Sequence, residues 1–213
     1  MPRVTVILFA LLVAAGCTDN RSLDGTPTED LGAFRLGHNV VVASKMQQVI
    51  ISRNATEEEW VTALTAAIDD RFSRYEGSDL FHFGVSVEGF SLAPPGIPVI
   101  AAPKSVLFIN VTVWDDAAGK KINEKPHQIL VFESLTGGSI VGTGYTQSRE
   151  EQLAGLAFNA AYRIEAWLAE QHAENNWFAA DATQGDEVSD EPEAPEQVQD
   201  AVDDLVTGLR DQS

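Results

Sequence analysis

Two stretches of the chain repeat apolar residues at the three- and four-residue spacing of an amphipathic helix. The first follows residues 56–59 (TEEE), which fit a capping box with Thr56 as the N-cap, and Gly77 is expected to end this helix. The second follows residues 148–151 (SREE), another capping box. The apolar stripes are Trp60, Leu64, Ile68, Phe72 and Tyr75 in the first helix, and Leu153, Leu156, Ala157, Ala160, Ala161, Ile164, Trp167 and Leu168 in the second.

The other elements have the pattern of strands. Residues 40–42 form a continuous apolar run that suits a strand covered on both faces, whereas residues 81–88 and 105–114 alternate between apolar and polar. Residues 129–132 are the expected returning strand, and residues 139–145 are a candidate edge strand. The order β-α-β-β-β-α, with hairpin loops, predicts an α+β fold: an antiparallel sheet of about four strands with two amphipathic helices packed on one face.

The N-terminus has the parts of an export signal. Arg3 precedes an apolar run over residues 4–14, which is too short to span a membrane. We therefore predict a signal peptide over residues 1–16, a lipidated N-terminus and flexible linker over 17–37, and the α+β domain over 38–178. Residues 179–213 are expected to be an acidic, mostly disordered tail with a short helix over 196–209.

The single cysteine of the chain, Cys17, follows the small residues 14–16. This string resembles the lipobox of bacterial lipoprotein signal peptides; the alternative is an ordinary cleaved signal that happens to end in cysteine. The resemblance implies a diacylglyceryl cysteine at position 17, with further acyl chains such as palmitate. Thr18, rather than an aspartate, follows the cysteine, which resembles lipoproteins sorted to the outer membrane. A lone cysteine also excludes a disulfide within the chain.

Net charge limits the classes of partner. The chain carries −18 in total, and residues 174–213 contribute twelve acidic groups against one arginine. No basic patch is present in the sequence, so nucleic-acid binding is not expected. The same charge disfavours attraction to anionic lipids, and the lipid at Cys17 is the expected link to the membrane.

Residues suited to catalysis or metal binding are scattered. The four histidines lie in different predicted elements without the spacing of metal ligands; they are His38, His82, His127 and His172. No nucleophile elbow occurs, and the Gly-Thr-Gly string at residues 142–144 lacks the lysine of a P-loop. We therefore predict no catalytic residue, no cofactor and no metal site.

Residues 89–103 contain no charged residue and include four prolines. An exposed apolar loop is a plausible contact for a partner, through Leu92, Ile97, Val99 and Ile100. The alternative is a loop that folds back over the edge of the sheet.

Signal, lipobox, linker and the element order of residues 38–172 together resemble uncharacterised lipoproteins of Gram-negative bacteria and periplasmic accessory lipoproteins. The resemblance implies a non-enzymatic envelope protein, anchored by lipid on the periplasmic face of the outer membrane, that serves as an accessory or scaffold subunit for a protein partner. An alternative is a small-molecule or glycan-binding lipoprotein that uses the exposed sheet face, with Trp114 and His82 as contacts. An enzyme whose site is not visible in the sequence is the third alternative.

Overall fold

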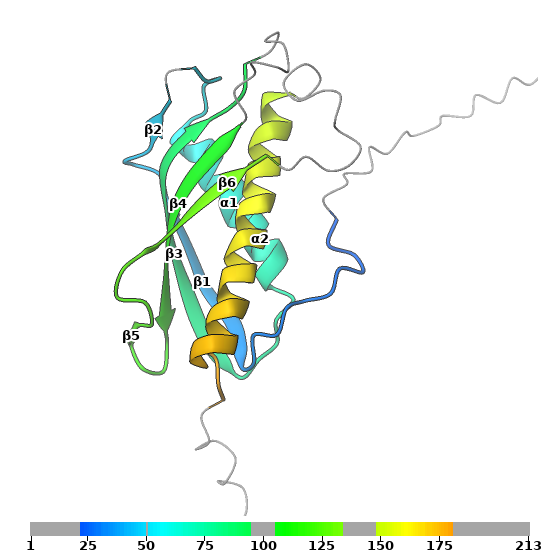
Figure 1. Cartoon of the computed structure of the whole chain (residues 1–213), viewed down its shortest axis with the longest axis vertical. Helices are drawn as coiled ribbons and strands as arrows, with labels where there is room; N and C mark the ends of the chain where they lie inside the picture. The colour runs from blue at the N-terminus through cyan, green and yellow to red at the C-terminus, as the bar shows by residue number, and fades with distance from the viewer. Residues whose placement is uncertain (1–21, 50, 95–104, 134–147, 181–213) are drawn as a thin grey trace, which may run out of the picture. The chain divides into compact units, whose positions relative to one another are not determined.

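The computed structural model describes residues 22–49, 51–94, 105–133 and 148–180 (Figure 1). Within these residues two helices and six strands form an α+β fold, as the sequence predicts. In chain order the elements are β1 (Phe34–Val42), β2 (Gln47–Gln48), α1 (Glu57–Phe72), β3 (Asp79–Ser91), β4 (Val106–Asp115), β5 (Lys120–Lys121), β6 (His127–Phe132) and α2 (Arg149–Asn175).

The sheet is mixed, which corrects the prediction of an antiparallel one. β1 pairs with β3 in parallel, β3 pairs with β4 antiparallel, and β6 pairs with β4 antiparallel. The two-residue strands β2 and β5 extend the edges beside β3 and β4. The parallel pair arises because α1 connects β1 to β3, and a strand–helix–strand crossover returns the chain in its original direction.

Both helices lie on the same face of the sheet (Figure 1). Both capping boxes are present, so the predicted helix starts at Thr56 and Ser148 are confirmed. The predicted apolar stripes face the sheet, because all their members are buried except Tyr75, which is partly buried. The alternating apolar residues of β3 and β4 complete this core; they are Phe81, Phe83, Val85, Val87, Leu107, Ile109, Val111 and Val113.

The folded domain starts earlier than the predicted boundary at residue 38. Leu31 and Phe34 are buried in the core, and Phe34 packs against the rings of Phe83 and Phe178. The backbone N–H of Ala33 donates to the carbonyl oxygen of Phe178 at 2.9 Å. Residues 31–37 are therefore part of the domain and not of a linker, because their aromatic and aliphatic side chains belong to the core.

Two further expectations are wrong. Val40 and Val42 are exposed, so β1 is covered on one face only; both helices pack on the other side of the sheet. Helix α1 ends at Phe72 and not at Gly77. Gly77 instead lies against β1, and its N–H donates to the carbonyl oxygen of Phe34. A Cβ at this position would lie 2.2 Å from the carbonyl carbon of Ala33, so this close approach requires glycine.

Candidate functional site

The predicted partner loop is only partly a loop. Strand β3 extends to Ser91, and Leu92 is fully buried in the core. The carbonyl oxygen of Leu92 accepts from the N–H of Arg53, and its N–H donates to the hydroxyl of Ser52. Leu92 is therefore not a surface contact, which corrects that prediction. The other three predicted contacts, Ile97, Val99 and Ile100, lie outside the described residues.

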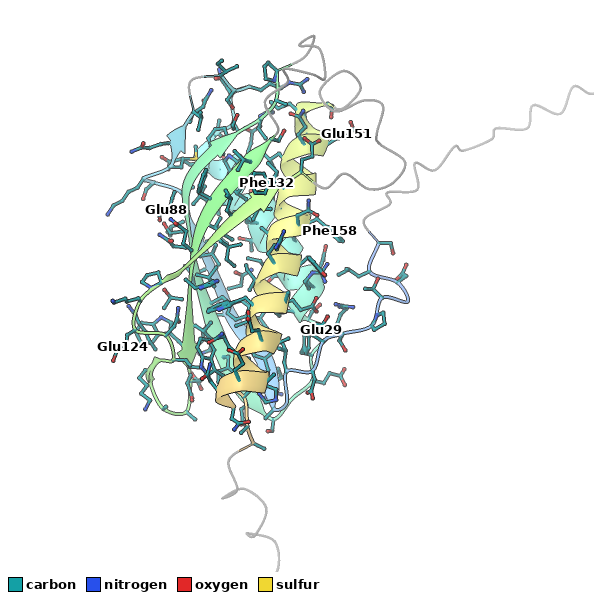
Figure 2. All side chains as sticks on the ribbon, in the orientation of Figure 1. Glu29, Glu88, Glu124, Phe132, Glu151 and Phe158 are labelled. Atoms are coloured by element: carbon teal, nitrogen blue, oxygen red, sulfur yellow. The ribbon has the colours of Figure 1, made fainter. Side chains whose placement is uncertain are left out.

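Large apolar side chains are instead exposed on the sheet face that the helices leave uncovered. We call this surface the open face; its exposed apolar members are Val40 and Val42 on β1, Trp114 on β4, and Leu130 and Phe132 on β6. Val40 is 57% exposed and Phe132 is 48% exposed. Figure 2 labels Phe132 on β6 and Glu88 on β3, which lies farther across the sheet. The open face thus spans the sheet from one long edge strand to the other.

The strand register explains this arrangement. Val40 pairs with Gly84 and Gly84 with Thr112, so these three residues form one row across β1, β3 and β4. Phe108 pairs with Leu130 in the same way. Successive residues of a strand alternate between faces, so the buried alternation of β3 and β4 leaves the intervening residues on the open face.

A shallow groove of about 320 Å³ runs over the open face. Its apolar lining residues include Val40, Val42, Trp114 and Pro126, and Lys121 also lines it. The Nζ atom of Lys121 lies 5.3 Å from the centre of the Trp114 ring. The ammonium group therefore lies over a face of the indole, in a cation–π contact.

His82 lies at one end of the open face, where β1 has an irregularity between Leu36 and Asn39. The backbone N–H of His38 donates to Nδ1 of His82 at 2.8 Å, and Nε2 of His82 lies 2.9 Å from Oδ1 of Asp116. Because Nδ1 is an acceptor, the neutral ring carries its proton on Nε2 and donates it to Asp116. Both ring nitrogens are therefore engaged: Nδ1 holds the backbone of β1, and Nε2 binds the side chain of Asp116, which follows β4.

The other two histidines also pack against aromatic rings. His127 stacks on Trp167 with 4.2 Å between ring centres, and burial lowers the pKa of His127. His172 lies beside Phe178, and its Nδ1 accepts from the Phe178 N–H. Among the described residues, no group of three His, Cys, Asp or Glu side chains is arranged to hold a metal ion.

A buried ionic cluster lies between the two helices, and the sequence reasoning missed it. Arg71 of α1 and Glu165 of α2 are each 2% exposed, and Nη1 of Arg71 donates to Oε2 of Glu165 at 2.5 Å. The other carboxylate oxygen accepts from Nη2 of Arg74 at 3.1 Å and from the Tyr75 hydroxyl at 2.6 Å. Burial, and next the hydrogen bond to Glu165, raise the pKa of Tyr75. The cluster ties α1 to α2, and its Arg71–Glu165 pair is closed to solvent.

A second ion pair joins the N-terminal ends of the helices. Arg149 donates to both carboxylate oxygens of Glu59, at 2.6 and 2.8 Å. The hydrogen bond from Arg149, and then that from the Thr56 N–H, lower the pKa of Glu59 to about 2. Glu59 thus completes the capping box of α1 and at the same time binds the first residue of α2.

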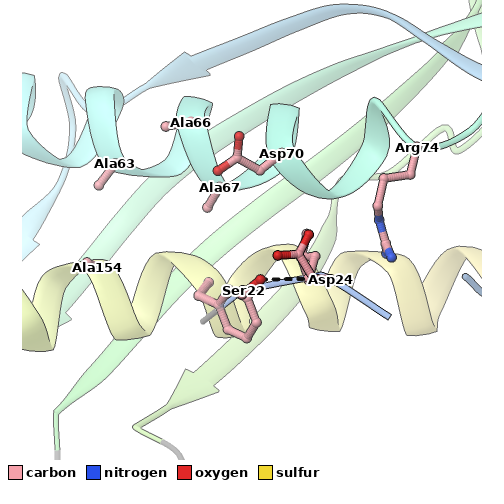
Figure 3. Close-up of a pocket in the computed structure, with 10 residues that line it drawn as sticks. Ser22, Asp24, Ala63, Ala66, Ala67, Asp70, Arg74 and Ala154 are labelled. Atoms are coloured by element: carbon pink, nitrogen blue, oxygen red, sulfur yellow. Dashed lines mark hydrogen bonds between the residues drawn. The ribbon is translucent and has the colours of Figure 1, made fainter. Parts of the chain in front are cut away.

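A groove of about 530 Å³ lies between α1 and α2 (Figure 3). Ala63, Ala67, Ala154 and Phe158 form much of its wall, and residues 22–24 line its outer side. Figure 3 shows Ser22 and Asp24 beside the helices, with the sheet behind them. The chain therefore approaches the domain over the helix layer, on the side opposite to the open face.

Comparisons with known proteins identify structures with a similar arrangement. A provisionally assigned lipoprotein from Caulobacter crescentus is 14% identical, with 62% of this chain and 92% of that chain covered and a TM-score of 0.35. A protein from Xanthomonas campestris is 9% identical, with 69% and 91% covered and a TM-score of 0.45. A minor lipoprotein from Acinetobacter baumannii is 15% identical, with 63% and 94% covered and a TM-score of 0.28.

Lipoproteins of Gram-negative bacteria are thus among the structures that this chain resembles. At these identities and TM-scores no residue role or activity is carried over to this chain. No protein-family model matches the sequence, and no curated protein is significantly similar to it. Among the described residues, neither helix is long and apolar enough to cross a bilayer.

Proposed function

We propose that this chain is a non-enzymatic, lipid-anchored envelope protein whose domain binds a partner protein through the open face. The proposal rests on the exposed apolar side chains of β1, β4 and β6, which contrast with the opposite face, where two helices bury the sheet. Burial of apolar surface contributes about 25 cal/mol per Å². A broad uncovered apolar face is typical of a surface that another molecule covers.

The anchor in this proposal is the lipid on Cys17. The apolar run before it is too short to span a membrane, and the residues before the cysteine are small. Thr18 at the next position favours delivery to the outer membrane, with the domain in the periplasm. The protein would then act as an accessory or scaffold subunit that holds its partner near that membrane.

A glycan or small molecule is the second candidate for the open face, and two contacts disfavour it. Sugars stack on the face of an aromatic ring, and Lys121 already lies over one face of Trp114. The nitrogens of His82 are engaged by His38 and Asp116. An enzyme is favoured still less, because the cluster around Glu165 is enclosed between the helices.

In-cell photo-crosslinking tests the proposal. A photoreactive residue at Val42 or at Leu130, both exposed on the open face, should give one prominent protein adduct. The same residue at Ala66, exposed on α1, is the matched control and should not give that adduct. Val42→Glu should abolish the Leu130 adduct, while Val42→Thr should retain it. Two results would refute binding through this surface: no adduct from Val42 or Leu130, or an equally strong adduct from Ala66.

A further inference from the structure

The first described residues are bound to the outer side of the helix layer. Ser22, Leu23 and Asp24 line the groove between α1 and α2. Nη1 of Arg74 donates to the carbonyl oxygen of Thr26 at 3.0 Å, so this segment is also held by a hydrogen bond. We call residues 22–27 the strap. The strap lies on the layer of the domain that is farthest from the open face (Figure 3).

Arg74 is itself fixed in place, which makes it a firm attachment for the strap. Its Nε donates to the carbonyl oxygen of Arg71, and its Nη2 donates to the buried carboxylate of Glu165. The same side chain therefore connects the core of the helix layer to the backbone of the strap. Beyond the strap, Leu31 is buried and Ala33 is hydrogen bonded to Phe178.

The length of chain between the lipid and the strap is short. Cys17 and Ser22 are five residues apart, and an extended chain spans at most ~3.3–3.6 Å per residue, or about 18 Å in total. A helix with its side chains is about 10–12 Å across. The sheet with its side chains adds a layer of about 10 Å, so the open face lies about 20 Å or more beyond the strap.

We propose that the strap determines which side of the domain faces the membrane: the α1–α2 surface faces the lipid headgroups and the open face points away from them. The inference rests on the proposed lipid anchor at Cys17. A tether of about 18 Å is too short for the open face to lie on the bilayer while the strap occupies its groove. The partner is therefore a periplasmic protein, or a periplasmic part of one, that approaches from the side away from the membrane.

Charge supports a tether rather than adhesion as the cause of this orientation. The exposed groups of α1 include Glu57, Glu58, Asp69 and Asp70, which anionic headgroups do not attract. The helix surface is therefore kept near the membrane by the length of the chain. Lengthening that chain should release the orientation without a change in the domain itself.

The experiment uses the full-length lipidated protein in phosphatidylethanolamine–phosphatidylglycerol vesicles that carry a headgroup-linked quencher. Because Cys17 is the single cysteine and its sulfur bears the lipid, a fluorophore can be attached to one introduced thiol. We compare Thr62→Cys on the helix side with Val42→Cys on the open face, both at exposed positions; Thr62 does not line the groove that holds the strap. We expect quenching of the Thr62 label to be several-fold stronger.

The matched control inserts twenty Gly and Ser residues between Asp19 and Asn20. The lengthened tether then has a root-mean-square span of roughly 25–30 Å, and the two labels should be quenched to a similar extent. Equal quenching without the insertion, in protein that floats with the vesicles, would overturn the orientation and leave the lipid anchor intact. Failure to float would refute the lipid anchor itself, and the orientation with it.

Discussion

Replacing Glu165 with glutamine should be strongly destabilising, although the two side chains have nearly the same shape. The carboxylate accepts hydrogen bonds from Arg71, Arg74 and Tyr75, and it is 2% exposed. The amide carries no charge and offers one acceptor oxygen in place of two. The guanidinium of Arg71, also 2% exposed, would then lack a countercharge.

Breaking a buried pair by removing one partner costs about 3–5 kcal/mol. Arg71 has few other compensating contacts: its guanidinium lies 5.1 Å from the Phe158 ring centre and 5.3 Å from that of Tyr162, and its Nε has no hydrogen-bond partner. For a domain of this size, a loss of about 3–5 kcal/mol corresponds to a fall in Tm of roughly 6–20 °C.

Urea denaturation of the soluble Cys17→Ser protein measures this change in the free energy of unfolding. Glu170→Gln is the matched control, because Glu170 is an exposed glutamate on the same helix and its loss should change stability by less than about 0.5 kcal/mol. The double variant Arg71→Met, Glu165→Leu should recover much of the loss, since it removes both charges from the interior. A Glu165→Gln protein within about 1 kcal/mol of the parent would refute the reasoning.

Three further outcomes follow from the structure. Gly77→Ala should destabilise the domain by about 1–3 kcal/mol, because its Cβ would lie 2.2 Å from backbone atoms. Gly155→Ala in α2 would meet nothing within 4 Å and should stabilise the domain by about 0.5–1 kcal/mol. Thermal unfolding compares the two variants, and equal effects on Tm would contradict the argument. The folded-state pKa of Glu59 is lowered to about 2, so its contribution to stability is complete above the ordinary value of 4.5 and is lost as the pH falls towards 2. Arg149→Met should weaken this pH dependence of the free energy of unfolding, measured by urea titration. An unchanged pH dependence would count against the Glu59–Arg149 ion pair. His82→Ala should cost about 0.5–1.5 kcal/mol by removing the acceptor for the N–H of His38, because this hydrogen bond is exposed and water can replace the acceptor. An unchanged midpoint of thermal unfolding would show that β1 does not need this contact.

Local signals in the sequence predicted the helices well. A capping box is made by residues three apart, so Thr56 with Glu59 and Ser148 with Glu151 could be recognised without any knowledge of the fold. Helix α1 ends at Phe72, earlier than expected, and Gly77 instead makes a close contact with β1 that depends on the tertiary structure.

The direction of β1 could not be predicted in the same way. Apolar alternation indicates which side chains face the core, but it carries no information on which strands pair or in which direction. The exposed positions of Val40 and Val42 likewise depend on both helices packing on one side. The sequence suggested an exposed sheet face only as the site of the alternative, glycan-binding function. Which apolar residues lie on that face can be identified only once the strand register is known.

The buried ionic cluster left a faint signal in the sequence. Arg71 follows Ile68 by three residues, and Glu165 follows Ala161 by four, so both charges fall on apolar stripes. A charge on such a stripe indicates a buried partner of opposite sign. The two residues are 94 positions apart, however, and no local pattern joins them.

The hydrogen bond between Ala33 and Phe178 places the start and the end of the domain side by side. A mechanical load applied between these two points would act directly on this hydrogen bond. The chain could also be reconnected there: a short loop that joins the residues after Phe178 to those before the buried Leu31, with new ends opened in the turn between β4 and β5, should preserve the fold as a circular permutant. The two ends of the folded domain therefore leave it from neighbouring points.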